Sequence, residues 1–458
     1  MNRENAEGRM AAENRLDRIV KRDGTEVPFD REKIRVAIYK AGAALSRHDK
    51  AFSEDAADEV VAILNTTYTP SNPPSVEEIQ DVVVETLRRR GRTEMAAAYI
   101  QYRAKRAAVR ERRQGGRERI PEPIPYKVLW RSYVWAVDHG VHTVEALNRR
   151  IREGSYPDLV RESDEAYEAQ VAEAAREILA SRDQVRIVIV AGPSSSGKTT
   201  TTIKLGEALE AEGLRLKALN VDHYFFDLDL HPKDASGDYD FETPEALDLH
   251  LIDRHLADLL AGREILTPFY DFGTGRREGP GAPFRLAKDE ILLIDTLHGL
   301  YDEMTKSIPA EAKYKLYVES LAQMKGPGGR FVRWYDIRLL RRMIRDTLHR
   351  AYDPRKTLMH WHYVRRSELK HIIPFLHDVD FIVNSALPYE LPALKAKLFA
   401  HFPRFLEEFR NDPANQDAFL RARRVHDLLA AVEPWTDDSV FPPKALIREF
   451  IGGSAYRY

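Results

Sequence analysis

The amino-acid sequence predicts an α/β domain with a doubly wound parallel sheet, preceded by a small, mostly helical unit with a short β-hairpin. The run VRIVIVAG from Val185 has the continuous apolar character of a strand buried on both faces. Further apolar runs at 216–222, 290–295 and 379–386 alternate with helical stretches, as in βαβ units. Residues 16–106 instead combine helical patterns with one hairpin signal.

Composition indicates a globular protein with more than one domain. At 458 residues the chain is longer than one compact core usually organises. The formal net charge is −2, so no global field draws the protein to nucleic acid or to an anionic membrane. The sequence has no bilayer-length apolar stretch, no signal-like apolar core at residues 1–15 and no cysteine. We therefore expect a cytoplasmic enzyme without disulfides, thiol chemistry, or membrane or nucleic-acid partners.

The N-terminal unit follows residues 1–14, which we interpret as a disordered lead. Apolar residues flank a Lys-Arg-Asp-Gly turn in RIVKRDGTEVPF (18–29), and this pattern predicts a hairpin. Three helical patterns follow, over 31–45, over 53–64 and from Ser75 onward. Asp30 is expected to cap the first helix, and Glu78 completes a capping box at the third.

A basic segment over 103–119 leads into the next part of the chain. It can contact phosphates, but such segments are more often solvated helix ends, and we favour that interpretation. Gly115, Gly116 and PEPIP at 121–125 mark a linker, and residues 126–181 have a helical, connective pattern.

The motif GPSSSGKT is the strongest chemical signal in the chain. It has the spacing of a phosphate-binding loop, and it lies between a buried strand and an amphipathic helix over 200–212, which a chance serine-glycine loop would not share. Its glycines let backbone N–H groups converge on phosphate oxygens at a helix N-terminus. The predicted ATP-binding residues are Gly192, Ser194, Ser195, Ser196, Gly197, Lys198, Thr199 and Thr200.

Three further side chains have predicted roles in phosphoryl transfer. Lys198 can bridge the β- and γ-phosphates, and the Thr199 hydroxyl can bind Mg²⁺. Asp295 ends the run EILLID like a second acidic motif and is the other predicted Mg²⁺ ligand, although a strand-end turn former has the same pattern. ATP and Mg²⁺ are the expected cofactors.

Asp222 ends the next strand, at the carboxyl edge of the sheet where ligands of such folds bind. A carboxylate there can accept a proton from a substrate hydroxyl, or hold Mg²⁺ through water. An aspartate that merely caps the following turn is the alternative, and we favour the catalytic interpretation.

Two segments combine aromatic and acidic residues, GDYDFETPEAL (237–247) and PFYDFGTGRR (268–277). Such residues suit a pocket that stacks a planar base and binds sugar hydroxyls. From the residues alone, packed loops are the slightly favoured explanation.

Four arginines recur at helical spacing in RWYDIRLLRRMIRD (333–346), namely Arg338, Arg341, Arg342 and Arg345. On a closing lid they can neutralise charge in the transition state, whereas a solvent-exposed helix is the usual explanation of a charged face. The choice of arginine, whose fork binds phosphate in a bidentate manner, favours phosphate contact.

From Val185 to about Leu394 the sequence resembles the uridine kinase and phosphoribulokinase-like branch of P-loop kinases. The matching motifs are GPSSSGKT, DHY at Asp222, YDFETP at Tyr239, YDF at Tyr270 and DIRLLRR at Asp336. The resemblance implies that Asp222 is the catalytic base and that the lid arginines, Arg338 and Arg341 among them, contact phosphates. The residues implied in acceptor binding are Tyr224, Tyr239, Glu242, Tyr270, Phe272, Arg276 and Arg342.

Within that set, the resemblance places Tyr270 and Phe272 beside the nucleobase and Glu242 at the ribose hydroxyls. Two positions depart from the family pattern. Gly275 stands where uridine-cytidine kinases have a base-reading histidine, and Asp295-Thr296 replaces an acid-glycine pair. The resemblance therefore supports nucleoside-type phosphoryl transfer more strongly than uridine itself. The C-terminal REFIGGSAY resembles a bacterial uridine kinase-like subgroup with a longer extension.

The N-terminal unit resembles the ATP-cone, a regulatory domain of ribonucleotide reductases and their transcriptional repressor. VKRDG, PFDREKI and AYIQYR carry the resemblance, which implies that ATP or dATP binds at Val20, Lys21, Arg22 and Lys33. Both usual hosts need cysteine, and this chain has none, so the cone is expected to regulate the kinase.

These features predict a kinase that transfers the γ-phosphoryl group of ATP to a nucleoside hydroxyl, the 5′ position of a pyrimidine nucleoside first of all, under control of ATP and dATP. A phosphorylated sugar or glycerate-type acid is an alternative acceptor, and an ATP-driven regulatory switch is a second alternative. The expected partners are ATP, dATP, a small acceptor and further copies of the chain in a homo-oligomer.

The predicted organisation has five parts. They are a lead at 1–14, the cone at 15–108, a basic linker and helical connector at 109–182, the kinase domain at 183–395 with a lid near 330–350, and a helical extension at 396–458.

Overall fold

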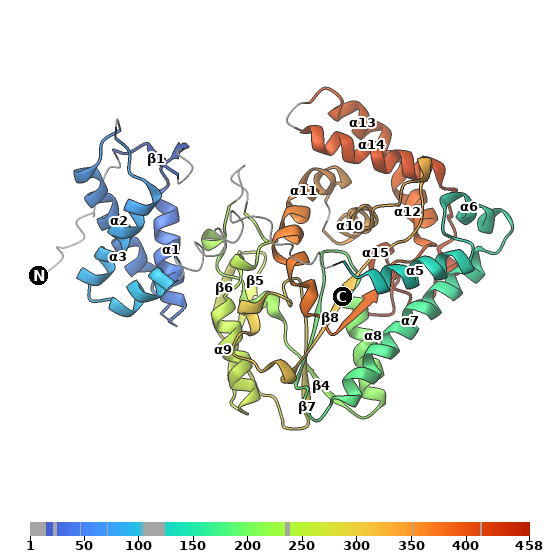
Figure 1. The fold of residues 1–458 in the computed structure, drawn as a ribbon, viewed down its shortest axis with the longest axis horizontal. Coiled ribbons are helices and arrows are strands. Elements are labelled where there is room, and N and C mark those ends of the chain that lie inside the picture. Colours follow the sequence, from blue (N-terminus) through green and yellow to red (C-terminus); the bar gives the residue numbers. More distant parts are fainter. Residues whose placement is uncertain are drawn as a thin grey trace, which may run out of the picture. The chain divides into compact units, whose positions relative to one another are not determined.

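The computed structural model describes residues 15–21, 25–45, 47–70, 72–101, 103, 124–233, 239–350, 352–412 and 415–458. The chain divides into two compact units, Met1–Glu122 and Pro123–Tyr458, which are drawn in Figure 1. The lead at 1–14, Arg22 and all of the basic segment after Arg103 lie outside the described residues.

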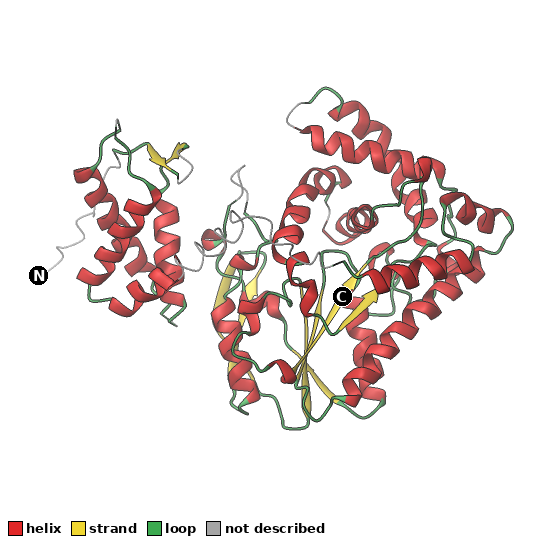
Figure 2. Cartoon of the chain, in the orientation of Figure 1, coloured by secondary structure: helices red, strands yellow, loops and turns green. Residues whose placement is uncertain are grey.

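The N-terminal unit is a small helical domain with one hairpin, as the sequence predicts. Strands β1 (Arg18–Val20) and β2 (Glu26–Pro28) pair in antiparallel fashion. Helices α1 (Arg31–Ala43), α2 (Lys50–Thr67) and α3 (Val76–Arg89) follow, and Figure 2 shows that they dominate the unit. The Asp30 cap and the Ser75–Glu78 capping box are both present, so the predicted helix starts are confirmed.

A five-stranded parallel sheet forms the centre of the larger unit. The strands are β3 (Ile187–Ala191), β4 (Arg215–Ala218), β7 (Glu290–Thr296), β8 (Lys313–Glu319) and β9 (Phe381–Asn384). Their order is β4-β7-β3-β8-β9, with every pair parallel. The predicted α/β class is confirmed, and β8 is the one strand of this sheet that the sequence analysis does not identify.

Both faces of the sheet are covered, which explains the unbroken apolar run of β3. Val188 and Val190 pack in one core with α7 (Tyr156–Ala180), α8 (Lys198–Ala211), α10 (Trp334–Arg350), α11 (Pro354–His371) and α12 (Glu390–Leu398). Ile187 and Ile189 pack in a second core with α9 (Leu249–Leu260). Alternate residues of β3 therefore supply opposite layers, which lie on either side of the strands in Figure 1.

The second aromatic-acidic segment forms a hairpin beside this sheet. Strand β5 (Ile265–Asp271) pairs in antiparallel fashion with β6 (Arg276–Phe284). The hairpin contributes Ile265 and Tyr270 to the α9 core. It therefore fixes the aromatic residues of this segment near the carboxyl edge of the sheet.

The helical connector and the C-terminal extension complete the core of the larger unit. They contain α5 (Tyr126–Asp138), α6 (Val144–Arg152), α13 (Phe402–Phe409), α14 (Gln416–Ala431) and α15 (Arg448–Ile451). Tyr156 of the connector stacks on Trp435 of the extension at 4.3 Å between ring centroids. Phe441 stacks on Tyr389 at 5.5 Å. The two segments thus pack on the sheet domain and on each other.

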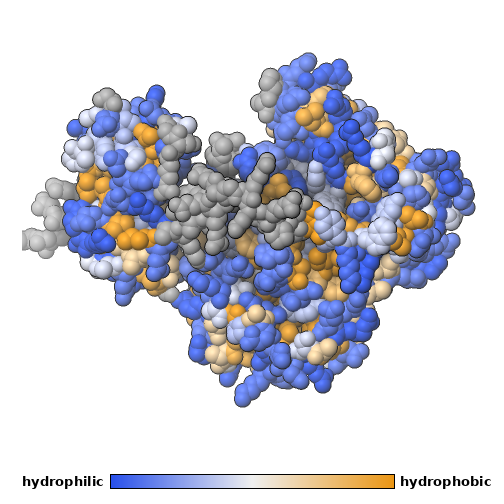
Figure 3. Space-filling model, viewed as in Figure 1, coloured by the Kyte–Doolittle hydropathy of each residue, from blue (hydrophilic) through white to orange (hydrophobic). Residues whose placement is uncertain are grey.

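The face of the molecule in Figure 3 is mainly hydrophilic, with small hydrophobic areas. Within the described ranges, no helix combines the length and the apolar character that crossing a membrane requires.

Candidate active site

The phosphate-binding loop joins β3 to α8 through backbone conformations that few residues adopt. Gly197, the N-cap of α8, has φ 89°, and Ser195 has φ 61°, the one positive φ outside glycine among the residues that the structure describes. A Cβ atom on Gly192 would lie 2.3 Å from the carbonyl oxygen of Val318, so this position requires glycine. The predicted loop residues thus form a tight turn that leads into the first N–H groups of α8.

Lys198 is the first residue of α8, and its side chain folds back over the loop. Its Nζ donates a hydrogen bond to the carbonyl oxygen of Pro193 at 3.2 Å. Burial lowers the pKa of Lys198, and the carboxylates of Asp295 and Glu449 oppose that shift. The ammonium group therefore lies at the loop in which phosphates are predicted to bind.

Thr199 and Asp295 meet at the carboxyl end of the sheet. Thr199 Oγ1 donates a hydrogen bond to Asp295 Oδ2 at 2.9 Å. Burial raises the pKa of Asp295, whereas the Lys198 ammonium and this hydrogen bond oppose the rise. Mg²⁺ prefers oxygen ligands and usually takes one or two carboxylates besides phosphates and water. The hydroxyl and the carboxylate therefore fit the expected ion.

Asp222 lies at the same edge, in a 3-10 turn over Val221–Tyr224. The backbone N–H of Asp222 donates to the side chain of Asn220 at 2.9 Å, so Asn220 is the residue that caps this turn. Asp222 itself is exposed, and its charge acts on Asp295. Asp222 therefore presents an exposed carboxylate at this edge, and Asn220, in its place, supplies the cap of the turn.

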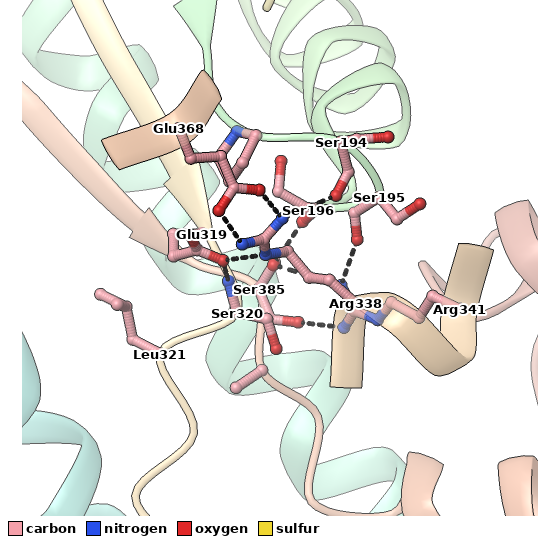
Figure 4. A network of polar contacts seen from close by, with 12 residues as sticks. Ser194, Ser195, Ser196, Glu319, Ser320, Leu321, Arg338, Arg341, Glu368 and Ser385 are labelled. Atoms are coloured by element: carbon pink, nitrogen blue, oxygen red, sulfur yellow. Dashed lines mark hydrogen bonds and ion pairs between the residues drawn. The ribbon is translucent and has the colours of Figure 1, made fainter. Parts of the chain in front are cut away.

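Arg338 of α10 reaches the phosphate-binding loop from the protein interior, as Figure 4 shows. Its guanidinium lies 2.7 Å from Glu319 Oε1 and bonds Glu368 at 2.5 and 2.9 Å. Burial alone would lower the pKa of Arg338, but these two carboxylates outweigh burial and raise it. The same guanidinium donates to the carbonyl oxygen of Ser194 at 3.0 Å. Arg338 thus holds the loop while its own charge is neutralised.

Arg341 holds the next residue of the loop in the same way. Its guanidinium bonds Glu390 at 2.6 and 2.8 Å and donates to the carbonyl oxygen of Ser195 at 3.4 Å. Both Arg338 and Arg341 are 0% exposed, so neither lies on an open side of the loop. We therefore interpret both as positioning residues, in place of the direct phosphate contact that the sequence suggests.

Arg342 joins the loop to the first aromatic-acidic segment. Its Nη1 donates to Ser194 Oγ and to Glu242 Oε1, each at 2.8 Å. The side chains of Arg342 and Glu242 are 20% and 18% exposed, so both reach the surface. The structure therefore brings two predicted acceptor residues to a predicted ATP-binding residue.

Both aromatic-acidic segments meet in one cluster of rings that follows the 3-10 turn. The ring of Phe225 lies 5.6 Å from Tyr270 and 6.0 Å from Phe272. It also lies 5.9 Å from Phe241 of the other segment. Phe272 is 61% exposed and Tyr239 is 36% exposed, whereas Tyr270 is 2% exposed. The cluster therefore offers open ring surface, with Tyr270 packed behind it.

The remaining predicted acceptor residues lie in different environments. Tyr224 is fully buried, and its hydroxyl meets Nδ1 of His255 at 3.0 Å, so it supports the core. Arg276 is exposed at the start of β6. Gly275 has φ 68°, and a Cβ atom there would lie 3.0 Å from Cβ of Leu228. A histidine at this position would therefore be strained, which gives a physical reason for the departure from the family pattern.

Several residues of this site carry no motif in the sequence. Glu319, Glu368 and Glu390 come from separate segments, so no spacing could connect them with the α10 arginines. Arg277 lies beside the predicted Arg276, but its guanidinium donates to the carbonyl oxygen of Tyr224 at 2.8 Å. It braces the turn that carries Asp222, and only the Arg-Arg pair of GTGRR points to it.

In the N-terminal unit, the described cations of the predicted regulatory site are accessible. Val20 ends β1 and the exposed Lys21 follows it. The Lys33 side chain, in the first turn of α1, is 79% exposed, and its Nζ lies 3.6 Å from Asp30 Oδ2. Arg22 is not among the described residues.

Comparison with protein families finds one match within each unit. The ATP cone domain matches residues 17–108, and the Phosphoribulokinase / Uridine kinase family matches residues 187–390. The first match covers the helical unit with its hairpin. The second runs from β3 to the start of α12 and contains every residue of the candidate site that the sequence analysis assigns to ATP, Mg²⁺ and the acceptor.

Individual relatives likewise match different parts of the chain. Over 198 residues, 43% of this chain, it is 29% identical to a uridine kinase of Deinococcus deserti, covering 86% of that protein. A uridine kinase of Chloroflexus aurantiacus is 28% identical over 165 residues, 36% of this chain and 69% of the relative. A vitamin B12-dependent ribonucleoside-diphosphate reductase of Thermoplasma acidophilum is 43% identical over 104 residues, which are 22% of this chain and 13% of the reductase.

The buried carboxylates behind the loop lead to a prediction about stability. Glu368→Gln leaves the Arg338 guanidinium without one of its two buried counter-charges, and breaking such a pair costs about 3–5 kcal/mol. Urea unfolding of the full chain, followed by near-ultraviolet circular dichroism, should show this loss in the transition of the larger unit. Asp289→Asn, which removes a partner of the exposed Arg215, should leave the midpoint unchanged. Equal midpoints for the wild type and Glu368→Gln would contradict the positioning role.

Proposed function

We propose that this chain, which carries an ATP-cone domain ahead of a kinase domain of the phosphoribulokinase / uridine kinase family, transfers the γ-phosphoryl group of ATP to the hydroxyl of a nucleoside. The 5′-hydroxyl of a pyrimidine nucleoside is the preferred acceptor in this proposal. The observation that carries it is the exposed carboxylate of Asp222 at the same sheet edge as Thr199 and Asp295.

In this mechanism Asp222 accepts the proton of the attacking hydroxyl, because its exposed carboxylate lies at the sheet edge that carries Thr199 and Asp295 and its charge acts on Asp295. The backbone N–H groups of the loop and the Lys198 ammonium bind the β- and γ-phosphates. Thr199 and Asp295 would hold Mg²⁺, which neutralises phosphate charge when it is bound. Arg338 and Arg341 act indirectly, since they fix the loop that orients the triphosphate.

The aromatic cluster supports a nucleoside as the acceptor. Exposed rings of Phe272 and Tyr239 suit a planar base, and the partly exposed Glu242 carboxylate can accept hydrogen bonds from sugar hydroxyls. Gly275 favours the rival acceptor, a phosphorylated sugar or glycerate-type acid, because its backbone conformation and the nearby Leu228 disfavour a base-reading side chain at this position. A regulatory switch without an acceptor would need neither the rings nor Asp222.

Regulation by the cone is the second part of the proposal. ATP or dATP would bind at Val20, Lys21, Arg22 and Lys33, and would shift the chain between active and inactive assemblies. Any such coupling is reciprocal, so an acceptor at the kinase site would alter nucleotide affinity at the cone. Self-association and a cytoplasmic location belong to the same proposal.

Turnover with a panel of acceptors tests the proposed reaction. ADP release from Mg²⁺-ATP should depend on one or more nucleosides, with sugar phosphates inert. Asp222→Asn should lower kcat by about 10²–10⁴-fold, because it removes the proton acceptor, while ATP affinity stays near the wild-type value. Lys198→Ala is the blank for contaminating kinases. ADP release that depends on ribose-phosphate or glycerate alone, or on no acceptor at all, would refute the nucleoside assignment.

A separate prediction concerns the cone. Addition of dATP should change the turnover of the full chain, and the double variant Lys21→Ala/Lys33→Ala should lose this response, because both exposed cations face phosphates in the proposed site. Arg88→Ala, an exposed cation on α3 of the same unit, should retain the response. If the double variant responds to dATP as the wild type does, the cone site lies elsewhere.

A further inference from the structure

The C-terminal segment, residues 441–458, returns to the phosphate-binding loop. Leu446 packs directly on Gly197, where a Cβ atom would lie 2.8 Å from Leu446 Cδ1. Phe450 packs under the Arg341 guanidinium, which lies 4.9 Å from its ring centroid. Leu446 and Phe450 both lie beyond the family match, which ends at residue 390. The segment is therefore an additional wall of the nucleotide site.

Glu449 of this segment accepts hydrogen bonds from Thr200 in the first turn of α8, the helix that follows the phosphate-binding loop. Its Oε2 accepts hydrogen bonds from the Thr200 backbone N–H at 3.2 Å and from Thr200 Oγ1 at 2.7 Å. The Tyr458 hydroxyl lies 3.0 Å from the same Thr200 oxygen. Thr200 is 0% exposed and Glu449 is 5% exposed, so a ligand in solution does not reach the Thr200 donors while the carboxylate is in place.

The N-terminal donors of such a helix are the groups that bind a nucleotide's phosphates. A carboxylate is an anion and satisfies them in the same way, through charge and hydrogen bonding. Glu449 Oε1 also lies 3.8 Å from Nη1 of Arg345, the fourth arginine of the α10 series. The carboxylate thus stands between a helix donor and a guanidinium, which are two groups that attract phosphate.

We propose that Glu449 is an internal competitor of the nucleotide: its carboxylate occupies the phosphate position at Thr200 and must leave it when ATP binds. This inference rests on ATP binding at the loop, and it adds a control of that binding by residues 441–458. When the triphosphate enters, Thr200 and Arg345 exchange one anionic partner for another, so neither group is left buried without a counterpart.

The displacement concerns the Glu449 side chain alone, because Leu446 and Phe450 on either side of it are fully buried in the core. Gly452 and Gly453 directly follow the short helix α15 and adopt φ 85° and 73°, which only glycine tolerates readily. Beyond them, the segment is fastened to α8 by an exposed contact, in which the Tyr456 hydroxyl donates to Glu207 Oε2 at 2.9 Å. Exposed contacts of this kind contribute little stability, so this contact opposes movement of residues 454–458 only weakly.

Calorimetric titration of Mg²⁺-ATP into the full chain tests this proposal. Glu449→Gln keeps the size of the side chain but removes the charge, so ATP should bind at least about fivefold more tightly than to the wild type. Glu207→Gln removes the charge of a carboxylate that contacts Lys444 and Tyr456 of the same segment but not Thr200, and it should keep the wild-type affinity. Unchanged or weaker ATP binding by Glu449→Gln would overturn the proposal and leave Glu449 as a structural helix cap.

Hydrogen exchange of the wild type provides a second test that needs no variant. Saturating Mg²⁺-ATP should increase amide exchange in residues 454–458, because the triphosphate displaces the Glu449 carboxylate and the Tyr458 hydroxyl from Thr200. Exchange that is unchanged or slower would overturn the proposal, whether or not Glu449→Gln folds. Absence of ATP binding in the wild type and in both variants would instead refute the nucleotide site itself, and with it the proposed function.

Discussion

In a phosphate-binding loop the backbone N–H groups point toward the site at which the anion binds. The carbonyl oxygens of the loop then point away from that site, and they need hydrogen-bond donors from the protein interior. In this protein the donors are Arg338 and Arg341, which bond the carbonyl oxygens of Ser194 and Ser195 from the interior. Two buried guanidinium groups would be prohibitively costly alone, so each is paired with carboxylates at hydrogen-bonding distance. The rest of the site depends on this backing, because it fixes the direction in which the loop opens.

The four arginines of α10 divide into two pairs with different surroundings. Arg338 and Arg341 face inward and are fully buried, whereas the side chains of Arg342 and Arg345, on the same helix, are 20% and 22% exposed and contact Glu242 and Glu449. A helix with four arginines thus serves two layers of the site. The C-terminal segment contacts the same site, because Glu449 bonds Thr200 of α8 and pairs with Arg345 of α10.

Sequence patterns predict most of the fold because local physics dictates it. The β3 run, the caps of the first helices and the turn of the β1–β2 hairpin each depend on a few adjacent residues. Strand β8 escapes detection because Lys313 and Lys315 interrupt the apolar pattern of KYKLYVE, and the structure supplies them with Thr305 and Asp378 as partners. The β5–β6 hairpin escapes because its turn, with Gly275, lies inside a motif that suggests a loop.

In the candidate site, too, sequence patterns identify some residues and not others. Asp222, Lys198, Thr199 and Asp295 are marked by strand ends and loop spacing, and the structure gathers them. No sequence pattern predicts the pairing of Arg338 and Arg341 with Glu319, Glu368 and Glu390, because these carboxylates lie in separate segments of the chain. Glu449 is 249 positions from Thr200, its partner, and no local pattern could connect the two.

The central claim is that a phosphoryl group passes to a nucleoside hydroxyl at the carboxyl edge of this sheet. The most direct measurement is phosphorus nuclear magnetic resonance of the products formed from Mg²⁺-ATP and a pyrimidine nucleoside. The account predicts a new phosphate monoester whose resonance is split by two protons of the 5′ carbon, at the same rate as ADP appears. Growth of the inorganic phosphate resonance with ADP, and of no ester resonance, would contradict it.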